Sequence, residues 1–199
     1  FSFDKVIEIN YMGYGLESIF GTLVGISATY IALFILFGAF INKTSIGIFF
    51  KDFAIAVAGK GLGGPAKVAV FSSALFGMVS GGATANVFTT GTFSIPMMKK
   101  IGFKPEFAGA VEAAASTGGQ YMPPVMGATA FLIAEFTGIP YVKIMIGASI
   151  SAILYFFTLY VSVHYRSLKN AHQLNKYTKE EKTNWKNILY RSYLLTPIL

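Results

Sequence analysis

The sequence contains no cysteine and few charged residues, and both shortages narrow what the chain can be. Without cysteine there is no disulfide framework, no thiolate metal site and no cysteine nucleophile. Only 13% of the 199 residues are charged, against roughly 25% in soluble globular domains. Hydrophobic residues make up 54% of the chain, and the mean hydropathy is +0.58. The composition therefore predicts an all-α integral membrane protein, not a water-soluble domain.

The charge balance is basic, with 16 Lys and Arg against 9 Asp and Glu, giving a net charge of +7. In a soluble protein this excess suggests nucleic acid as a partner. Here the basic residues flank apolar runs and do not form a face with interleaved aromatics. We therefore expect no nucleic acid, and we interpret these residues as topology signals in contact with membrane lipid.

Uncharged runs divide the chain into predicted membrane segments. Residues 19–41 hold 23 uncharged residues, enough for a transmembrane helix after an extracytoplasmic lead-in over 1–18. Charges recur in 43–67, which favours an interfacial helix and linker on the cytoplasmic side. The other predicted segments are a broken transmembrane helix at 105–134, a transmembrane helix at 142–164, a basic cytoplasmic linker at 165–187 and the start of a further, truncated helix at 188–199. We expect the chain to be a piece of a longer protein.

The run from residue 68 to residue 98 is open to two interpretations, because its 31 uncharged residues fit one long crossing or a re-entrant hairpin of two half-helices. A hairpin places 13 of the 16 basic residues on one face of the membrane. A single crossing places the richest basic cluster opposite the first. The positive-inside rule favours the hairpin with cytoplasmic flanks.

The middle of this run, residues 76–86, is rich in Gly, Ser, Thr and Asn. Unpaired backbone at the tip of a membrane hairpin is tolerated only where it is buried in protein or lines a water-filled cavity. The tip is therefore a candidate site. The alternative is a close-packed pair of Gly-rich helices with no ligand. Asn86, an amide on one limb, either ligates or forms a hydrogen bond across the hairpin.

A second irregular point is predicted where two glycines precede two prolines. Pro123 and Pro124 lack amide hydrogens and are expected to free the carbonyl groups of Gly119 and Gln120. The result is a broken helix with at least two carbonyl oxygens in need of a partner. The alternative is a plain proline kink. A re-entrant tip beside a helix break is how secondary transporters hold a sodium ion and an anionic substrate.

These residues resemble a known family, the large membrane subunit of tripartite ATP-independent periplasmic (TRAP) transporters, and most closely the fused permeases that work with TAXI-type binding proteins. The resemblance runs from about Ile19 to His164. It is carried by Gly63-Gly64-Pro65-Ala66-Lys67, Ser80-Gly81-Gly82, Asn86, Thr89-Thr90-Gly91, Ile95-Pro96, the block Pro105 to Gln120 and the block Met122 to Gly127.

The resemblance implies a sodium-driven elevator in a bacterial or archaeal cytoplasmic membrane, with this chain as half of an inverted repeat. A periplasmic TAXI-type binding protein delivers the substrate, a small organic acid anion, and a small membrane subunit or a fused equivalent completes the permease. The implied sodium ligands are Ser80, Gly81, Gly82, Ala83, Asn86, Gly119, Met122 and Pro124. The implied substrate contacts are Ser80, Gly82, Thr84, Asn86 and Gln120.

Glu112 is the one acid well inside a predicted crossing. It either relays or compensates charge, or it reaches the cytoplasmic interface near Glu106, and we favour the second interpretation. An enzyme is disfavoured, because no His cluster, acid pair or activated Ser with a base can be assembled. Ion-coupled uptake is the leading hypothesis. A passive channel and a non-transporting scaffold subunit are the alternatives.

Overall fold

The computed structural model describes residues 2–12, 21–33, 36, 40, 46–59 and 61–171. Within these ranges every regular element is a helix and there is no strand, as predicted. Most of the predicted linker at 165–187, the predicted helix start at 188–199 and parts of 1–18 and 19–41 lie outside the described residues. The elements are α1 (Phe3–Ile7), the π-helix η1 (Glu8–Met12), α2 (Thr22–Ile26), the π-helix η2 (Ser27–Ile31), α4 (Ile46–Ala58), α5 (Gly64–Ser80), α6 (Ala83–Lys100), α7 (Pro105–Gly118), the 3₁₀ turn η3 (Gly119–Tyr121), α8 (Ala128–Thr137) and α9 (Tyr141–Lys169).

The run 68–98 is two helices, so the interpretation as one long crossing is wrong. Helix α5 ends at Ser80 and α6 begins at Ala83. Gly81 makes the reversal with φ +58°, a left-handed conformation that a residue with a Cβ adopts only with strain, and its N–H donates to the Gly77 carbonyl at 3.1 Å. The two glycines between the helices thus allow the chain to turn back.

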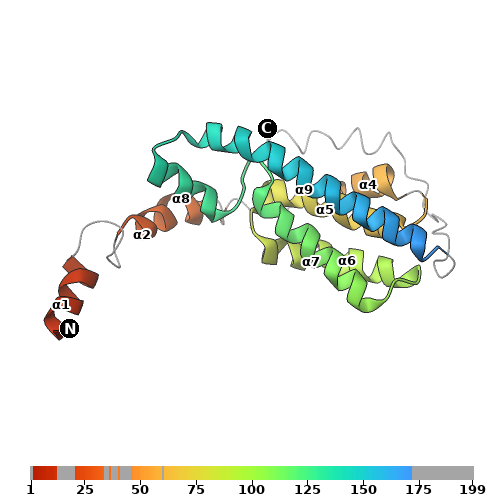
Figure 1. Cartoon of the computed structure of the whole chain (residues 1–199), viewed down its shortest axis with the longest axis horizontal. Coiled ribbons are helices and arrows are strands. Elements are labelled where there is room, and N and C mark those ends of the chain that lie inside the picture. The colour runs from red at the N-terminus through yellow and green to blue at the C-terminus, as the bar shows by residue number, and fades with distance from the viewer. Residues whose placement is uncertain are drawn as a thin grey trace.

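The outer ends of α5 and α6 lie at the same end of the bundle. Ala66, near the start of α5, and Met98, near the end of α6, belong to one buried apolar cluster. The same cluster contains Phe103 from the following turn and Val163 from α9. In Figure 1, α9 runs along α5 and α7, while α8 lies beside α2 at the other end of the bundle. Helix α5 is therefore the centre of the arrangement, with α4, α6, α7 and α9 packed around it.

Helical geometry is interrupted between α7 and α8. Pro105 starts α7 at a position where a missing N–H costs nothing. The helix ends at Gly118, tightens into η3, and residues 122–127 are not helical before α8 begins at Ala128. Two consecutive prolines, which cannot donate backbone hydrogen bonds, fall inside this interval.

Among the described residues, α9 is the one helix long and apolar enough to cross a membrane. It extends beyond the predicted crossing at 142–164, so residues 165–169, predicted to begin the basic linker, are helical. Ile146, Ile150 and Ile153 along α9 are more than 60% exposed. An exposed apolar face of this length is typical of a surface that meets lipid or another protein segment.

Helix α5 and the turn η3 approach so closely that only glycine fits at the contact. A Cβ added at Gly77 would collide with the Gly119 Cα, and one added at Gly119 would lie 2.9 Å from the Gly77 Cα. Both neighbours are backbone atoms and cannot rotate away. The contact therefore fixes the distance between the hairpin and the helix interruption.

We predict that Gly77→Ala destabilises the full-length protein by about 1–3 kcal/mol, because it forces two backbones apart. Gly109→Ala is the matched control, since its Cβ meets nothing within 4 Å and the helix gains up to about 1 kcal/mol. The midpoint of thermal unfolding of each purified variant is the measurement. A Gly77→Ala variant as stable as the Gly109→Ala variant would contradict this packing.

Candidate ion and substrate site

The hairpin tip lies directly against the interruption between α7 and α8. A Cβ added at Gly81 would collide with the Met126 carbonyl oxygen, and one at Gly127 would lie 3.4 Å from the Gly81 carbonyl oxygen. Met126 has a positive φ of 54°, so the chain makes a sharp local turn where it faces the tip. Two of the predicted site segments, far apart in sequence, are thus brought together.

Asn86 is fully buried and forms a hydrogen bond across the hairpin. Its Nδ2 donates to the Ser73 carbonyl on α5 at 2.8 Å. The same nitrogen lies 2.7 Å from the position that a Gly119 Cβ would occupy. Its Oδ1 faces the Thr90 hydroxyl at 3.4 Å. Asn86 therefore ties the two limbs together beside the interruption, and its amide oxygen is the atom that is suited to a cation.

Ser80, the last residue of α5, supplies an unpaired oxygen at the tip. Its Oγ is buried and has no hydrogen-bond partner in the part of the chain that the structure describes. A buried hydroxyl without a partner costs roughly 1–3 kcal/mol. This oxygen atom is suited to coordinate a hard monovalent cation, together with other neutral oxygens.

The expectation that two carbonyl groups would be left unpaired by the prolines is wrong. The Gly119 carbonyl accepts from the Met122 N–H at 3.2 Å, and the Gln120 carbonyl accepts from the Gly127 N–H at 2.8 Å. The first bond closes the 3₁₀ turn before the prolines, and the second forms because the chain turns back on itself after them. Each oxygen keeps a second lone pair, so it can still face a cation.

The remaining predicted residues differ in exposure. Gly82 and Ala83, at the start of α6, are half-buried. Thr84 and Gln120 are exposed. Met122 packs its side chain against the main apolar cluster, and the Pro124 carbonyl accepts from the Tyr141 hydroxyl at 3.0 Å. The structure thus brings Gly81, Asn86 and Gly119 to one place.

Glu112 is completely buried, so the favoured prediction that it reaches the cytoplasmic interface is wrong. Hydroxyl groups from three helices surround its carboxylate. Ser73 of α5 lies 3.4 Å from Oε1 and Ser116 of α7 lies 3.1 Å from it. From α6, Thr90 donates to Oε1 and Ser94 donates to Oε2. The sequence contained an indication of this cluster. Thr90 and Ser94 are spaced i, i+4, as are Glu112 and Ser116, so the two residues of each pair lie on one face of their helix.

Within the described residues Glu112 forms no ion pair, and no group of three His, Cys, Asp or Glu is arranged to hold a metal. Its four partners are all neutral hydroxyls. The carboxyl group is therefore buried with no oppositely charged side chain among its hydrogen-bond partners in the described part of the chain.

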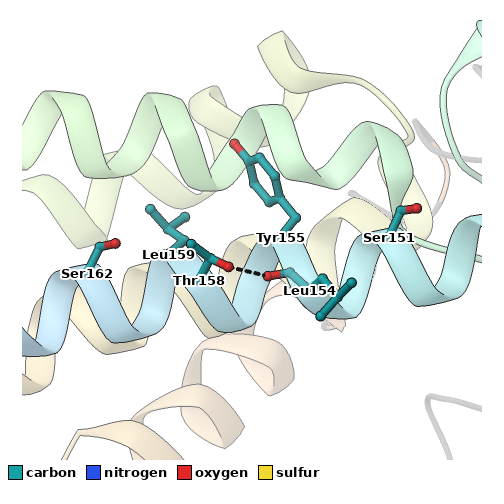
Figure 2. Close-up of a pocket in the computed structure, with 6 residues that line it drawn as sticks. All are labelled: Ser151, Leu154, Tyr155, Thr158, Leu159 and Ser162. Carbon is teal, nitrogen blue, oxygen red and sulfur yellow. Dashed lines mark hydrogen bonds between the residues drawn. The ribbon is translucent and has the colours of Figure 1, made fainter.

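A shallow groove on α9 is a separate feature (Figure 2). It has a volume of about 530 Å³ and contains none of the predicted site residues. Its lining residues are Ser151, Leu154, Tyr155, Thr158, Leu159 and Ser162. Tyr155 points toward α7, where its hydroxyl donates to the Ala114 carbonyl at 2.8 Å, and Thr158 donates to the Leu154 carbonyl of its own helix. The hydroxyls of Tyr155 and Thr158 therefore already have partners.

Comparison with known proteins places these features in a family. Residues 10–199 match the model of the family described as "Tripartite ATP-independent periplasmic transporter, DctM component". That match covers nearly the whole chain, including the hairpin and the interruption.

Individual relatives match shorter stretches. The C4-dicarboxylate TRAP transporter large permease protein DctM of Pseudomonas aeruginosa is 31% identical over 109 residues, which are 55% of this chain and 26% of that protein. The protein of the same name from Rhodobacter capsulatus is 33% identical over 94 residues, 47% of this chain and 21% of that protein. The uncharacterized protein YgiK of Salmonella typhimurium is 30% identical over 102 residues, 51% of this chain and 23% of that protein. The matched stretches thus span about a quarter of the length of these relatives.

We predict that Thr90→Val destabilises the full-length protein by about 1–3 kcal/mol, because Glu112 loses a buried hydrogen-bond donor. Thr89→Val is the matched control on the same helix. Thr89 donates to the Ala85 carbonyl of its own helix, and its loss should cost no more than about 0.5 kcal/mol. Thermal unfolding of both variants is the measurement, and equal stability would show that the buried bond contributes nothing.

Proposed function

Because the chain belongs to the DctM component family of tripartite ATP-independent periplasmic transporters, we propose that it forms part of a sodium-coupled secondary transporter that imports a small organic acid anion. Two of the relatives are named as C4-dicarboxylate permeases, which supports a carboxylate as the substrate class. The proposed location is the cytoplasmic membrane of a bacterium or archaeon, with several membrane crossings.

The observation that carries the proposal is the contact between the hairpin tip and the interruption. Gly81, Asn86 and Gly119 converge there, and among the described residues the buried Ser80 hydroxyl has no hydrogen-bond partner. In the proposed site one sodium ion binds Ser80 Oγ, Asn86 Oδ1 and the remaining lone pairs of nearby carbonyls. Neutral oxygens are suited to a monovalent cation. A divalent ion is better matched by ligands that carry a permanent negative charge.

The substrate binds next to this ion in the proposed arrangement. The exposed side chains of Thr84 and Gln120 offer hydroxyl and amide groups to an organic anion. The N-terminus of α6 adds a positive dipole end, which favours a carboxylate. A sodium ion at the tip neutralises part of the substrate charge, which couples the binding of the two.

We propose that α5 and α6 form a re-entrant hairpin and that α7 and α8 are two parts of one broken membrane helix. Helices of 17 and 18 residues are each about 26 Å long, short of the roughly 30 Å hydrocarbon core. Basic residues gather at the outer end of the bundle, where the Lys67 ammonium lies 5.6 Å from the Tyr160 ring centre and the Arg166 guanidinium 5.9 Å from that of Phe107. This end is the proposed cytoplasmic side.

The proposed mechanism is an elevator in which this chain supplies half of an inverted repeat. The exposed apolar face of α9 and the exposed tip residues support contact with further segments of the transporter. The proposed partners are a periplasmic substrate-binding protein of the TAXI type and a small membrane subunit or its fused equivalent. The TAXI assignment rests on the resemblance of residues 105–127.

We predict that uptake by the full-length protein in proteoliposomes, supplied with its binding protein, requires an inward sodium gradient. Ser80→Ala should raise the sodium concentration for half-maximal uptake roughly five- to tenfold, the cost of one neutral ligand. Ser72→Ala is the control, because Ser72 donates to the Ala69 carbonyl of its own helix. Saturating uptake without any sodium gradient would contradict the coupling, and conductance without saturation would favour a channel.

We predict that Lys51→Cys and Lys100→Cys label from the cytoplasmic face and Ile139→Cys from the opposite face. Because these 199 residues contain no cysteine, each substituted thiol is the one that reports from this part of the protein. The residues lie on α4, at the end of α6 and between α8 and α9, and the readout is labelling by a membrane-impermeant maleimide in oriented vesicles. Labelling of positions 51 and 100 from opposite faces would exclude the hairpin topology.

A further inference from the structure

The buried carboxylate of Glu112 is the strongest feature that the proposed tip site does not use. It lies at the junction of α5, α6 and α7, with hydroxyl partners from each. None of the four hydroxyl residues around it belongs to the predicted sodium or substrate set. It is therefore a separate cluster of oxygen atoms within the same bundle.

In the part of the chain that the structure describes, no positively charged side chain forms a hydrogen bond or ion pair with this carboxylate. The other charged residues on α5, α6 and α7 are Lys67, Lys99, Lys100 and Glu106, all near the outer ends of these helices. On α9, which packs against α5 and α7, the titratable residues are Tyr141, Lys143, Tyr155, Tyr160, His164, Tyr165, Arg166 and Lys169. Hydrogen bonds place only neutral groups on Glu112 within the described residues. Buried charges in proteins are normally paired or coordinate a cation.

Oxygen atoms from three helices converge on the Glu112 carboxylate. The Ser116 and Ser73 hydroxyls lie 3.1 and 3.4 Å from Oε1, and the Ser73 and Thr90 hydroxyls are 3.2 Å apart. Carboxylate and hydroxyl oxygens are the kind of ligand that a hard cation prefers. A site with one carboxylate and several neutral hydroxyls matches a monovalent cation better than a divalent one.

We propose that Glu112, with the hydroxyls of Ser73, Thr90, Ser94 and Ser116, is a second cation site that takes one exchangeable monovalent cation, a sodium ion or a proton. The cation neutralises the carboxylate and is released during the transport cycle. This inference rests on the proposed function, because exchange requires a protein that alternately opens the bundle to each side of the membrane.

Thr90 connects this second site to the hairpin tip. Its hydroxyl has one hydrogen but four possible acceptors in range: Glu112 Oε1, the Asn86 carbonyl at 2.8 Å, the Ser73 hydroxyl at 3.2 Å and Asn86 Oδ1 at 3.4 Å. When the carboxylate is charged, it is the strongest acceptor. When a cation neutralises it, the hydrogen is released to Asn86, the residue that spans the hairpin. Occupancy of the second site thereby changes the hydrogen bonding of the tip.

The test is cation binding by the purified full-length protein, measured as the shift of its thermal unfolding midpoint. Sodium chloride is titrated against choline chloride at constant ionic strength, at pH values on both sides of neutrality. A cation that binds the folded state raises the midpoint with concentration. Glu112→Gln keeps the shape of the side chain and removes its charge, and Glu106→Gln on the exposed face of the same helix is the matched control.

Two comparisons, one of the sodium response and one of the pH response, distinguish a sodium ion from a proton. If the cation is sodium, Glu112→Gln flattens the sodium-dependent rise relative to the wild type and Glu106→Gln at each pH. If it is a proton, Glu112→Gln removes a component of the pH dependence that persists without sodium. Sodium and pH responses that are both identical in Glu112→Gln and Glu106→Gln overturn the proposal.

Ser116→Ala keeps the test decisive where Glu112→Gln fails to fold. It leaves the charge in place and should weaken cation binding roughly ten- to hundredfold, as for other partners of ion ligands. An unchanged affinity in Ser116→Ala then overturns the proposal. The readout needs no transport, so its failure is distinct from a failure of sodium-driven uptake, which concerns Ser80 and the tip.

Discussion

The close approach of two backbones, at Gly77 on α5 and Gly119 at the end of α7, is the constraint on which the rest of the arrangement depends. Neither position has room for a Cβ, so the hairpin and the interrupted segment meet main chain to main chain. Asn86 reaches this contact from α6, and Gly81 extends it to the loop around Met126. A side chain at either glycine would separate all of these groups at once.

Beneath this contact lies a polar core that is unusual for so apolar a chain. Asn86, Thr90, Ser94 and Glu112 are all fully buried, and hydrogen bonds link them into one network across α5, α6 and α7. Networks of this kind hold neighbouring helices in one register, because each group has few alternative partners. The same network contains Glu112, the one acidic side chain that is buried among the described residues, so packing and the proposed cation binding share the same residues.

The sequence predicted what depends on local chemistry and on charge distribution. Helical structure followed from composition, and a turn within residues 76–86 was expected because small residues there permit unusual backbone angles. The prediction that the carbonyls of Gly119 and Gln120 lack partners was wrong. A proline shows which helical hydrogen bond is lost, but it does not show that another N–H of the chain replaces the missing donor. The burial of Glu112 was missed because its partners come from three helices, and only the packing of those helices shows that their hydroxyls converge.

Helix α9 has a consequence of its own for how the protein sits in lipid. Its 29 residues make it about 43 Å long, roughly 13 Å more than a hydrocarbon core is thick. A helix with that surplus leans away from the bilayer normal or projects its final turns among the headgroups. Arg166 and Lys169 occupy those final turns, where phosphate groups would hold them and set the depth of the whole bundle.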